Sequence, residues 1–184
     1  MILLRHGQSY FNLHFTNTRR DPGIEDPELT ELGHEQARRA AERLATQNLE
    51  RVIISPYTRA LQTAEPFLGR AGLQVEILAE VRERTAFTCD IGRPPAALAA
   101  QFPHHEFGHL QDRWWGYEVE TEAQTIARAR DFHAKMRQDP AAGQTLLVSH
   151  WGFILALTGQ SLANGTWIEF DPASPAPKQI NWQH

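Results

Sequence analysis

The sequence predicts an α/β fold of three layers, in which helices cover both faces of a largely parallel sheet. Short runs of strand-forming residues at 2–4, 52–54, 75–78 and 145–149 alternate with segments that have a helical pattern of apolar residues. This alternation is typical of βαβ units and therefore of a mostly parallel sheet. At 184 residues, the chain is long enough for one domain with a substantial core.

Composition and charge narrow the classes of function. The net charge of −4 argues against a general nucleic-acid or anionic-membrane binder. The single cysteine, Cys89, excludes an intrachain disulfide and suits a reducing cytoplasm. The apolar run at 153–157 is too short to span a bilayer, and no signal peptide precedes the first strand. We therefore expect a cytoplasmic protein with a small-molecule partner, and neither a nucleic acid nor a membrane.

The elements follow in order from local patterns. After the first strand, residues 10–27 are polar and are expected to form a loop. Thr30 is a candidate N-cap for a helix over 31–47, and Thr121 opens a capping box for a helix to about 138. The remaining expected elements are a helix from about 57 to 68, an extended segment at 80–84, an insertion at about 86–120 with a short helix from about 94 to 102, a short helix to about 157, and strands at 166–170 and 179–182.

The first candidate site follows the first predicted strand, as Arg5-His6-Gly7. An arginine can bind two phosphate oxygens at once. A neutral histidine can attack phosphorus through one ring nitrogen while the other nitrogen donates to a backbone carbonyl. Gly7 would let the backbone approach the anion closely. Because open α/β sheets bind ligands at the carboxyl ends of their strands, the sequence predicts a phosphate site here.

Two further groups are expected at the same edge of the sheet. His150 follows the strand at 145–149, so it should lie near His6 if both strands are parallel. Arg59 lies in the first turn of the helix after 52–54, where its charge opposes the helix dipole. A phosphate bound at that helix N-terminus would offset the penalty. The pattern therefore indicates two imidazoles and at least two guanidiniums around one anion.

Five segments, in order, resemble the signatures of the histidine phosphatase superfamily, the phosphoglycerate mutase-like group. The resemblance covers most of the chain. It rests on Leu4-Arg5-His6-Gly7-Gln8-Ser9 with Asn12, Leu29-Thr30-Glu31-Leu32-Gly33 with Gln36-Ala37, residues 55–64, Val81-Arg82-Glu83-Arg84, and Val148-Ser149-His150-Trp151-Gly152-Phe153.

The resemblance implies a role for each matched residue. His6 would be the nucleophile that takes the phosphoryl group, and Glu83 would be the general acid and base. His150 would act with them and bind phosphate oxygens, where charge accumulates in the transition state. Arg5, Arg59 and Asn12 would complete the phosphate site. No metal or other cofactor is implied.

Three functions fit this resemblance. The first is a metal-independent phosphomonoester hydrolase that acts through phosphohistidine, as in histidine acid phosphatases, and the second is a phosphoglycerate mutase. The third is a non-catalytic module that binds a phosphorylated ligand. The chain is short for a mutase and keeps all the expected catalytic residues, which favours the phosphatase. Gln8 and Trp151 depart from the family pattern, and they and Arg19 are candidate substrate-binding residues.

The predicted insertion holds two further clusters. His105-Glu106-Phe107-Gly108-His109 matches the His-Glu-x-x-His pattern of zinc hydrolases, which requires both histidines on one helix face. Pro103 and Gly108 disfavour a helix, so we interpret this segment, with His104, as a polar loop over the active site. Trp114 and Trp115 either contact an apolar part of the substrate or pack the insertion on the sheet, and the usual burial of aromatic residues favours packing.

Overall fold

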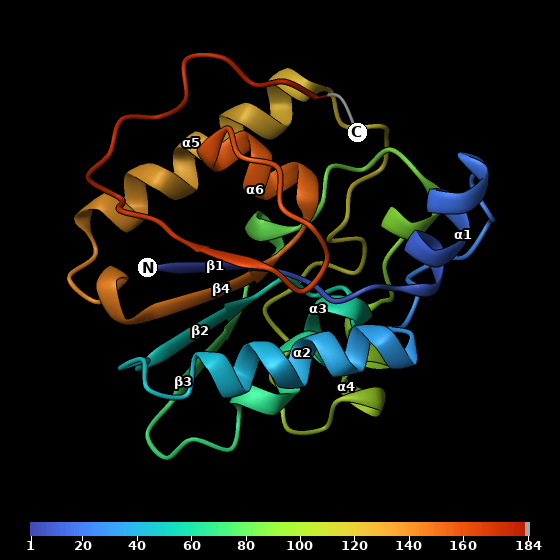
Figure 1. Cartoon of the computed structure of the whole chain (residues 1–184). Coiled ribbons are helices and arrows are strands. Elements are labelled where there is room, and N and C mark those ends of the chain that lie inside the picture. Colours follow the sequence, from blue (N-terminus) through green and yellow to red (C-terminus); the bar gives the residue numbers. More distant parts are fainter. Residues whose placement is uncertain (183–184) are drawn as a thin grey trace.

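The computed structural model describes residues 1–182 and shows the predicted three-layer α/β fold (Figure 1). The central sheet has five strands in the order β3-β2-β4-β1-β5. The four strands β1 (Ile2–Arg5), β2 (Arg51–Ile54), β3 (Gln74–Ile77) and β4 (Thr145–Ser149) pair in parallel, whereas β5 (Trp167–Glu169) runs antiparallel to β1. The prediction of a mostly parallel sheet is confirmed.

Helices cover both faces of the sheet. In Figure 1, α2 (Glu31–Arg43), α3 (Thr58–Ala64) and α4 (Pro95–Gln101) lie below it, and α5 (Glu122–Gln138) and α6 (Trp151–Thr158) lie above it. Alternate residues of β1 divide between the two layers, since Ile2 and Leu4 pack with α2 and α3 while Leu3 packs with α5 and α6. Short 3₁₀ turns complete the chain at Glu65–Phe67, Ala79–Val81, Thr88–Asp90 and Ala142–Gln144.

The pairing of β1 with β4 determines where the site lies. In this parallel register Arg5 is opposite Ser149, so His6 and His150 leave neighbouring strands at the same sheet edge. The His6 amide donates to the Ser149 carbonyl at 3.0 Å, which extends the pairing by one residue. The expected convergence of the two histidines is confirmed.

The segment after β1 was expected to be a loop, but its first half forms the helix α1 (Tyr10–Thr18). Ser9 caps this helix, because its hydroxyl accepts from the Asn12 amide while the Asn12 side chain accepts from the Ser9 amide. Phe11 is its one buried residue, so the helix lacks the apolar stripe that sequence periodicity detects. The loop prediction is wrong for residues 10–18.

Other boundaries also differ from those expected. The first long helix ends at Arg43 rather than near residue 47, and α3 gives way to a 3₁₀ turn at Glu65. Residues 179–182 do not form the expected last strand. In the part of the chain that the structure describes, no helix has both the length and the apolar character needed to cross a bilayer.

Candidate active site

A cavity of about 300 Å³ lies beyond the carboxyl ends of β1 and β4. Its lining includes five of the residues that the sequence analysis assigned to a phosphate site: Arg5, His6, Asn12, Arg59 and Glu83. These residues come from four separate segments of the chain, so the fold brings them together. A larger depression, beside Met1 and Asp139, contains none of them.

His6 is held with one ring nitrogen fixed. Its Nδ1 lies 2.7 Å from the Gly7 carbonyl, which can only accept, so Nδ1 carries the proton and Nε2 has a free lone pair. The side chain is 3% exposed. Burial, followed by the charges of Arg59 and Arg5, keeps the pKa of His6 well below its usual range. The ring is therefore neutral at physiological pH, as a nucleophile requires.

Gly7 has a different role from the expected one. A Cβ at this position would lie 2.4 Å from the Gly33 carbonyl oxygen, so the glycine permits close packing against the start of α2. The Gly7 amide donates to Thr63 Oγ1 at 3.0 Å and is thus bound to α3 rather than directed at an anion.

His150 lies beside His6, with the ring centroids 5.1 Å apart. Its Nε2 is 2.7 Å from Ser55 Oγ, and its Nδ1 has no hydrogen-bond partner although it is buried. Burial and the nearby charge of Arg59 lower the pKa of His150 well below its usual value. Because a buried polar atom without a partner is unfavourable, a ligand that reaches this nitrogen would be stabilised.

Two guanidiniums approach the cavity, and each is positioned by backbone carbonyls. Arg5 Nη1 donates to the Leu162 carbonyl at 2.6 Å, and Arg59 Nη1 donates to the Cys89 carbonyl at 2.7 Å. Burial lowers the pKa of Arg5 to about 10, which still leaves it charged at neutral pH. Arg59 is 2% exposed and lies 4.3 Å above the centre of the Tyr57 ring. The two cations are therefore fixed before any ligand binds.

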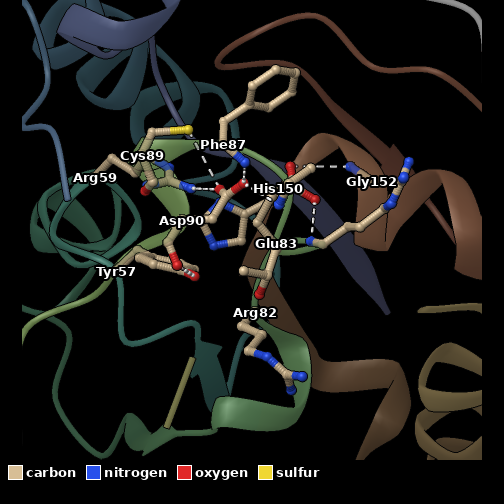
Figure 2. A network of polar contacts seen from close by, with 12 residues as sticks. Tyr57, Arg59, Arg82, Glu83, Phe87, Cys89, Asp90, His150 and Gly152 are labelled. Atoms are coloured by element: carbon tan, nitrogen blue, oxygen red, sulfur yellow. Dashed lines mark hydrogen bonds and ion pairs between the residues drawn. The ribbon is translucent and has the colours of Figure 1, made fainter. Parts of the chain in front are cut away.

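Glu83 is a partly buried carboxylate at the N-terminus of α6 (Figure 2). Its Oε1 accepts from the Arg84 amide at 2.8 Å, and its Oε2 accepts from the Gly152 amide at 3.1 Å. Burial, reinforced by the charge of Asp90, raises the pKa of Glu83 in spite of these two hydrogen bonds. A carboxyl group with a raised pKa can be protonated under mildly acidic conditions and can then donate a proton.

Asn12 completes the polar wall of the cavity. Its Oδ1 accepts from Ser9 Oγ at 3.0 Å and from Asn164 Nδ2 at 3.1 Å. Because the oxygen is held on the protein side, the amide nitrogen is left as a donor for a ligand. Asn164 was not predicted as a site residue, since the sequence showed it only as part of a turn.

One of the three candidate substrate-binding residues lies at the cavity, and the other two do not. Trp151 lines the cavity, whereas Gln8 and Arg19 do not. The Gln8 side chain accepts from Thr30 Oγ1 at 2.9 Å, at the start of α2. Arg19 is exposed at the end of α1, and its guanidinium lies 5.9 Å from the centre of the Phe15 ring.

The geometry of the site agrees with comparisons to known proteins. A family model described as the histidine phosphatase superfamily (branch 1) matches residues 1–175. The chain belongs to this superfamily. A glucosyl-3-phosphoglycerate phosphatase of Mycobacterium tuberculosis is 31% identical over 171 residues, which cover 88% of this chain and 74% of the relative. A 2,3-bisphosphoglycerate-dependent phosphoglycerate mutase of Mesorhizobium japonicum is 28% identical over 98% of this chain and 92% of its own length.

Solved structures show the same relationship for this histidine phosphatase fold. A structure of mycobacterial glucosyl-3-phosphoglycerate phosphatase superposes with a TM-score of 0.61 at 26% identity, and the match covers 91% of this chain and 87% of that one. The predicted family is therefore confirmed by both sequence and structure.

The histidine-rich segment lies away from the cavity in this histidine phosphatase. His104, His105 and His109 border a separate depression beside β3, and His109 Nε2 is 2.6 Å from the Ile77 carbonyl. The expectation of a polar loop over the active site is wrong for these residues. Residues 103–105 and 108–110 form turns and bends rather than the helix that a zinc-hydrolase motif needs. Within residues 1–182, no group of three or more histidine, cysteine or acidic side chains could hold a metal ion.

Both tryptophans of the predicted insertion are buried in the core. Trp114 packs against Tyr57 with the ring centroids 4.7 Å apart, and Trp115 packs edge-on against Trp114. Packing, the favoured alternative, is confirmed. The segment that does border the cavity is the start of the insertion, through Ala86, Phe87, Cys89 and Asp90.

Asp90 and Asp26 are the main charged residues that the sequence analysis missed. Asp90 Oδ1 pairs with Arg59 Nη2 at 3.2 Å, and its Oδ2 accepts from two backbone amides of the 86–90 turn (Figure 2). Asp26 accepts from the Thr58 amide at 2.9 Å and thereby occupies the N-terminus of α3. The anion expected there as a bound phosphate is a side chain of the protein itself.

Proposed function

We propose that this histidine phosphatase hydrolyses small phosphate monoesters through a phosphohistidine intermediate on His6. The observation that carries the proposal is the state of that ring. It is buried and neutral, its Nδ1 donates to a carbonyl, and its Nε2 is available beside two positioned guanidiniums. This is the arrangement that nucleophilic attack by an imidazole on phosphorus needs.

In the first step, His6 Nε2 forms a bond to phosphorus as the ester P–O bond breaks. Arg5 and Arg59, with the amide of Asn12, would stabilise the charge on the phosphoryl oxygens. The unpartnered Nδ1 of His150 is a fourth candidate contact for these oxygens. Protonated Glu83 would donate its proton to the leaving alkoxide, so the alcohol departs neutral.

In the second step, water attacks the phosphohistidine. Glu83, now a carboxylate, would accept a proton from this water as the P–N bond breaks, and His6 would return to its neutral form with release of phosphate. The raised pKa of Glu83 supports this double role. No step requires a metal, because Arg5, Arg59 and the amide of Asn12 would stabilise the charge on the phosphoryl oxygens.

The phosphatase is favoured over the mutase alternative by the curated relatives. The mycobacterial proteins, at 31–32% identity, are named phosphatases, whereas the mutases that match most of the chain share 28–29%. Incubation with 3-phosphoglycerate, with and without a 2,3-bisphosphoglycerate primer, separates the two, since only a mutase would form 2-phosphoglycerate.

The proposal also covers the domain organisation, the partner and the cellular location of the protein. The first residues of the insertion at about 86–120 border the cavity, which supports one domain with this segment beside the substrate. A net charge of −4 supports a small phosphorylated partner rather than nucleic acid or a membrane. One buried, unpaired cysteine is in keeping with the cytoplasm.

His6→Ala tests the proposal most directly. We expect loss of all measurable phosphatase activity with an unchanged circular dichroism spectrum, because the His6 side chain lines the cavity and its truncation leaves the apolar side chains of the core in place. Rapid quench of the wild-type enzyme with ³²P-labelled substrate into alkaline detergent should trap a phosphoprotein that is stable in alkali and labile in acid, and that the variant does not form. EDTA should leave the wild-type rate unchanged. Activity of His6→Ala within tenfold of wild type would overturn the proposal.

A further inference from the structure

Three phenylalanine rings form one wall of the active-site cavity. Phe11 and Phe15 come from α1, and Phe87 comes from the turn after Glu83. The centroids are 5.1 Å apart for Phe11 and Phe15, 5.6 Å for Phe11 and Phe87, and 5.1 Å for Phe15 and Phe87. The three rings thus touch one another and present a continuous apolar surface beside the phosphate site.

This wall is built into the fold on both sides. The capping box of Ser9 and Asn12 fixes the first turn of α1, and Asn12 itself lines the cavity. On the other side, the Phe87 amide donates to Asp90 Oδ2 at 3.0 Å, and Asp90 also pairs with Arg59. The ring of Phe87 nevertheless remains 39% exposed. An anchored aromatic ring with so much open surface beside a catalytic group is suited to contact a ligand.

A second pair of aromatic rings lines the same cavity. Trp151 and Trp182 lie with their ring centroids 6.0 Å apart, and the Trp151 Nε1 donates to Ser161 Oγ at 2.9 Å. The guanidinium of Arg84 lies 5.4 Å from the centre of the Trp182 ring. Five aromatic side chains therefore border a space of about 300 Å³, near the lower end of ligand-pocket volumes.

The charges of the cavity leave little attraction for a second anionic group on the substrate. Arg5 and Arg59 are assigned to the phosphoryl oxygens. Arg84, the other cation of the lining, donates to the Glu120 carbonyl and pairs with the Glu122 carboxylate at 3.7 Å. The lining also contains the carboxylate of Asp90, which pairs with Arg59 at 3.2 Å and so offsets part of the positive charge of the cavity.

We infer that the aromatic wall binds the alcohol half of the substrate, and that this half is apolar, uncharged and about the size of one aromatic ring. The inference rests on the proposed phosphatase activity and adds a substrate class to it. The preferred esters are arylalkyl phosphates, in contrast to the carboxylate-bearing sugar ester in the name of the mycobacterial relatives. Burial of the ring against Phe15 and Phe87 would provide the selectivity.

The test compares esters with similar alkoxide leaving groups, so that intrinsic reactivity does not decide the outcome. We expect wild-type kcat/KM for 2-phenylethyl phosphate to exceed that for 3-phosphoglycerate and for glucose 6-phosphate at least tenfold. As a measurement independent of turnover, phenylphosphonate should inhibit competitively with a KI at least tenfold below that of methylphosphonate. Equal KI values for the two phosphonates would overturn the inference.

Phe87→Ala should lower kcat/KM for 2-phenylethyl phosphate about tenfold, mainly through KM, and change that for 3-phosphoglycerate less than twofold. Phe87→Leu keeps an apolar side chain at this position. Its kcat/KM for 2-phenylethyl phosphate should therefore be close to that of the wild type. The matched control is Tyr117→Ala, an aromatic side chain that is 76% exposed and lies outside this cavity. An equal effect of Phe87→Ala on both esters would refute the role of the wall.

These outcomes separate the inference from the proposed function. If the wild-type enzyme hydrolyses none of the three esters and forms no phosphoprotein, the phosphatase proposal itself fails. If it hydrolyses all three but prefers 3-phosphoglycerate or glucose 6-phosphate, the phosphatase stands and the apolar substrate class is wrong.

Discussion

At the scale of single residues, the site contains two groups, the buried His6 and the partly buried Glu83, whose pKa values shift in opposite directions. Burial lowers the pKa of the His6 imidazole and raises the pKa of the Glu83 carboxyl group. A nucleophile must be neutral and a general acid must be protonated, and each shift favours the form that the first step requires. The same environment therefore favours both the neutral form of His6 and the protonated form of Glu83.

These shifts predict the pH dependence of kcat. Activity should fall at low pH as His6 gains a proton, and this limb should lie below the usual histidine pKa of about 6.5. It should fall again as Glu83 loses its proton, at a pH above the usual value of about 4.3. Glu83→Gln should remove the limb at higher pH and slow 2-phenylethyl phosphate roughly 10²–10⁴-fold. A variant that keeps both limbs would rule out Glu83 as the general acid.

The substrate provides an internal control for this variant. An ester with an acidic phenol, such as 4-nitrophenyl phosphate, needs little proton donation to its leaving group. Glu83→Gln should therefore reduce the rate of the phosphorylation step far less for 4-nitrophenyl phosphate than for 2-phenylethyl phosphate. A single-turnover experiment measures this rate. An equal loss for both esters would indicate a structural effect of the substitution.

Sequence reasoning placed Arg5, His6 and His150 at one edge of the sheet, because Arg5 ends the buried strand β1 and the two histidines directly follow β1 and β4. It did not identify Asp90, whose carboxylate meets Arg59 only through the turn of residues 86–90. A lone acidic residue 31 positions from its partner gives no local pattern. The phenylalanines of the wall were missed for a related reason, since two of them lie on a helix that the sequence pattern did not predict.

At the scale of elements, the N-terminus of α6 holds the proposed general acid in place. A Cβ at Gly152 would lie 2.4 Å from Glu83 Oε1, far closer than atoms can pack. The glycine thus permits the Gly152 amide to donate to the carboxylate. Glu83 also lies at the positive end of a helix dipole, which offsets part of the cost of burying its charge.

Gly152→Ala separates activity from stability at this position. Alanine favours a helix by up to about 1 kcal/mol over glycine, so the stability of α6 should be kept or lose little. The new methyl group should displace the carboxylate and lower kcat for 2-phenylethyl phosphate at least tenfold. The control is Gly143→Ala, where an added Cβ meets nothing within 4 Å. Wild-type kcat in Gly152→Ala would show that the position of the carboxylate is unimportant.

The strands were predicted more accurately than the segments between them. The buried strands β1, β2 and β4 appear within one or two residues of their expected positions, because burial on both faces leaves continuous runs of apolar residues. The edge strand β3 is also close to its expected position, although Ile77 is its one buried residue. The helix α1 was missed, since its stability comes from a capping box and from Phe11 rather than from an apolar stripe. The position of residues 104–109 depends on tertiary contacts with β3, such as that of His109 with the Ile77 carbonyl, and the local sequence pattern does not predict it.

At the scale of the whole molecule, the parallel strands place the cavity beyond their carboxyl ends and the ion pairs of Arg51 at the amino end of β2. Arg51, at the amino end of β2, pairs with Asp139 and Glu76 and is far along the sheet from the residue that follows β1. Arg5 and Arg59 at the cavity are proposed to bind the phosphoryl group, whereas Arg51 joins β2 to Asp139 and Glu76. This separation predicts which arginines respond to phosphate.

Inorganic phosphate should stabilise the folded protein through the cavity. At a concentration 100 times its Kd, a ligand that binds only the native state adds about 2.7 kcal/mol. For a chain of this size, that corresponds to a rise in Tm of roughly 5–10 °C by differential scanning calorimetry. Arg59→Gln should reduce the rise to near zero, while the exposed Arg38→Gln should retain it. A rise in Tm of the same size in Arg59→Gln would show that phosphate binds outside this cavity.

Three contacts that hold the first residues of the cavity come from late in the chain. The His6 amide reaches Ser149, Arg5 reaches Leu162, and the Asn12 carboxamide reaches Asn164. At a ribosomal rate of 5–20 residues per second, roughly 8–30 s separate the synthesis of the first partners from that of the last. A nascent chain that stops short of Asn164 carries the reactive imidazole without the framework that aims it. The proposed anion site of each newly made molecule is therefore complete only after residue 164 has been synthesised.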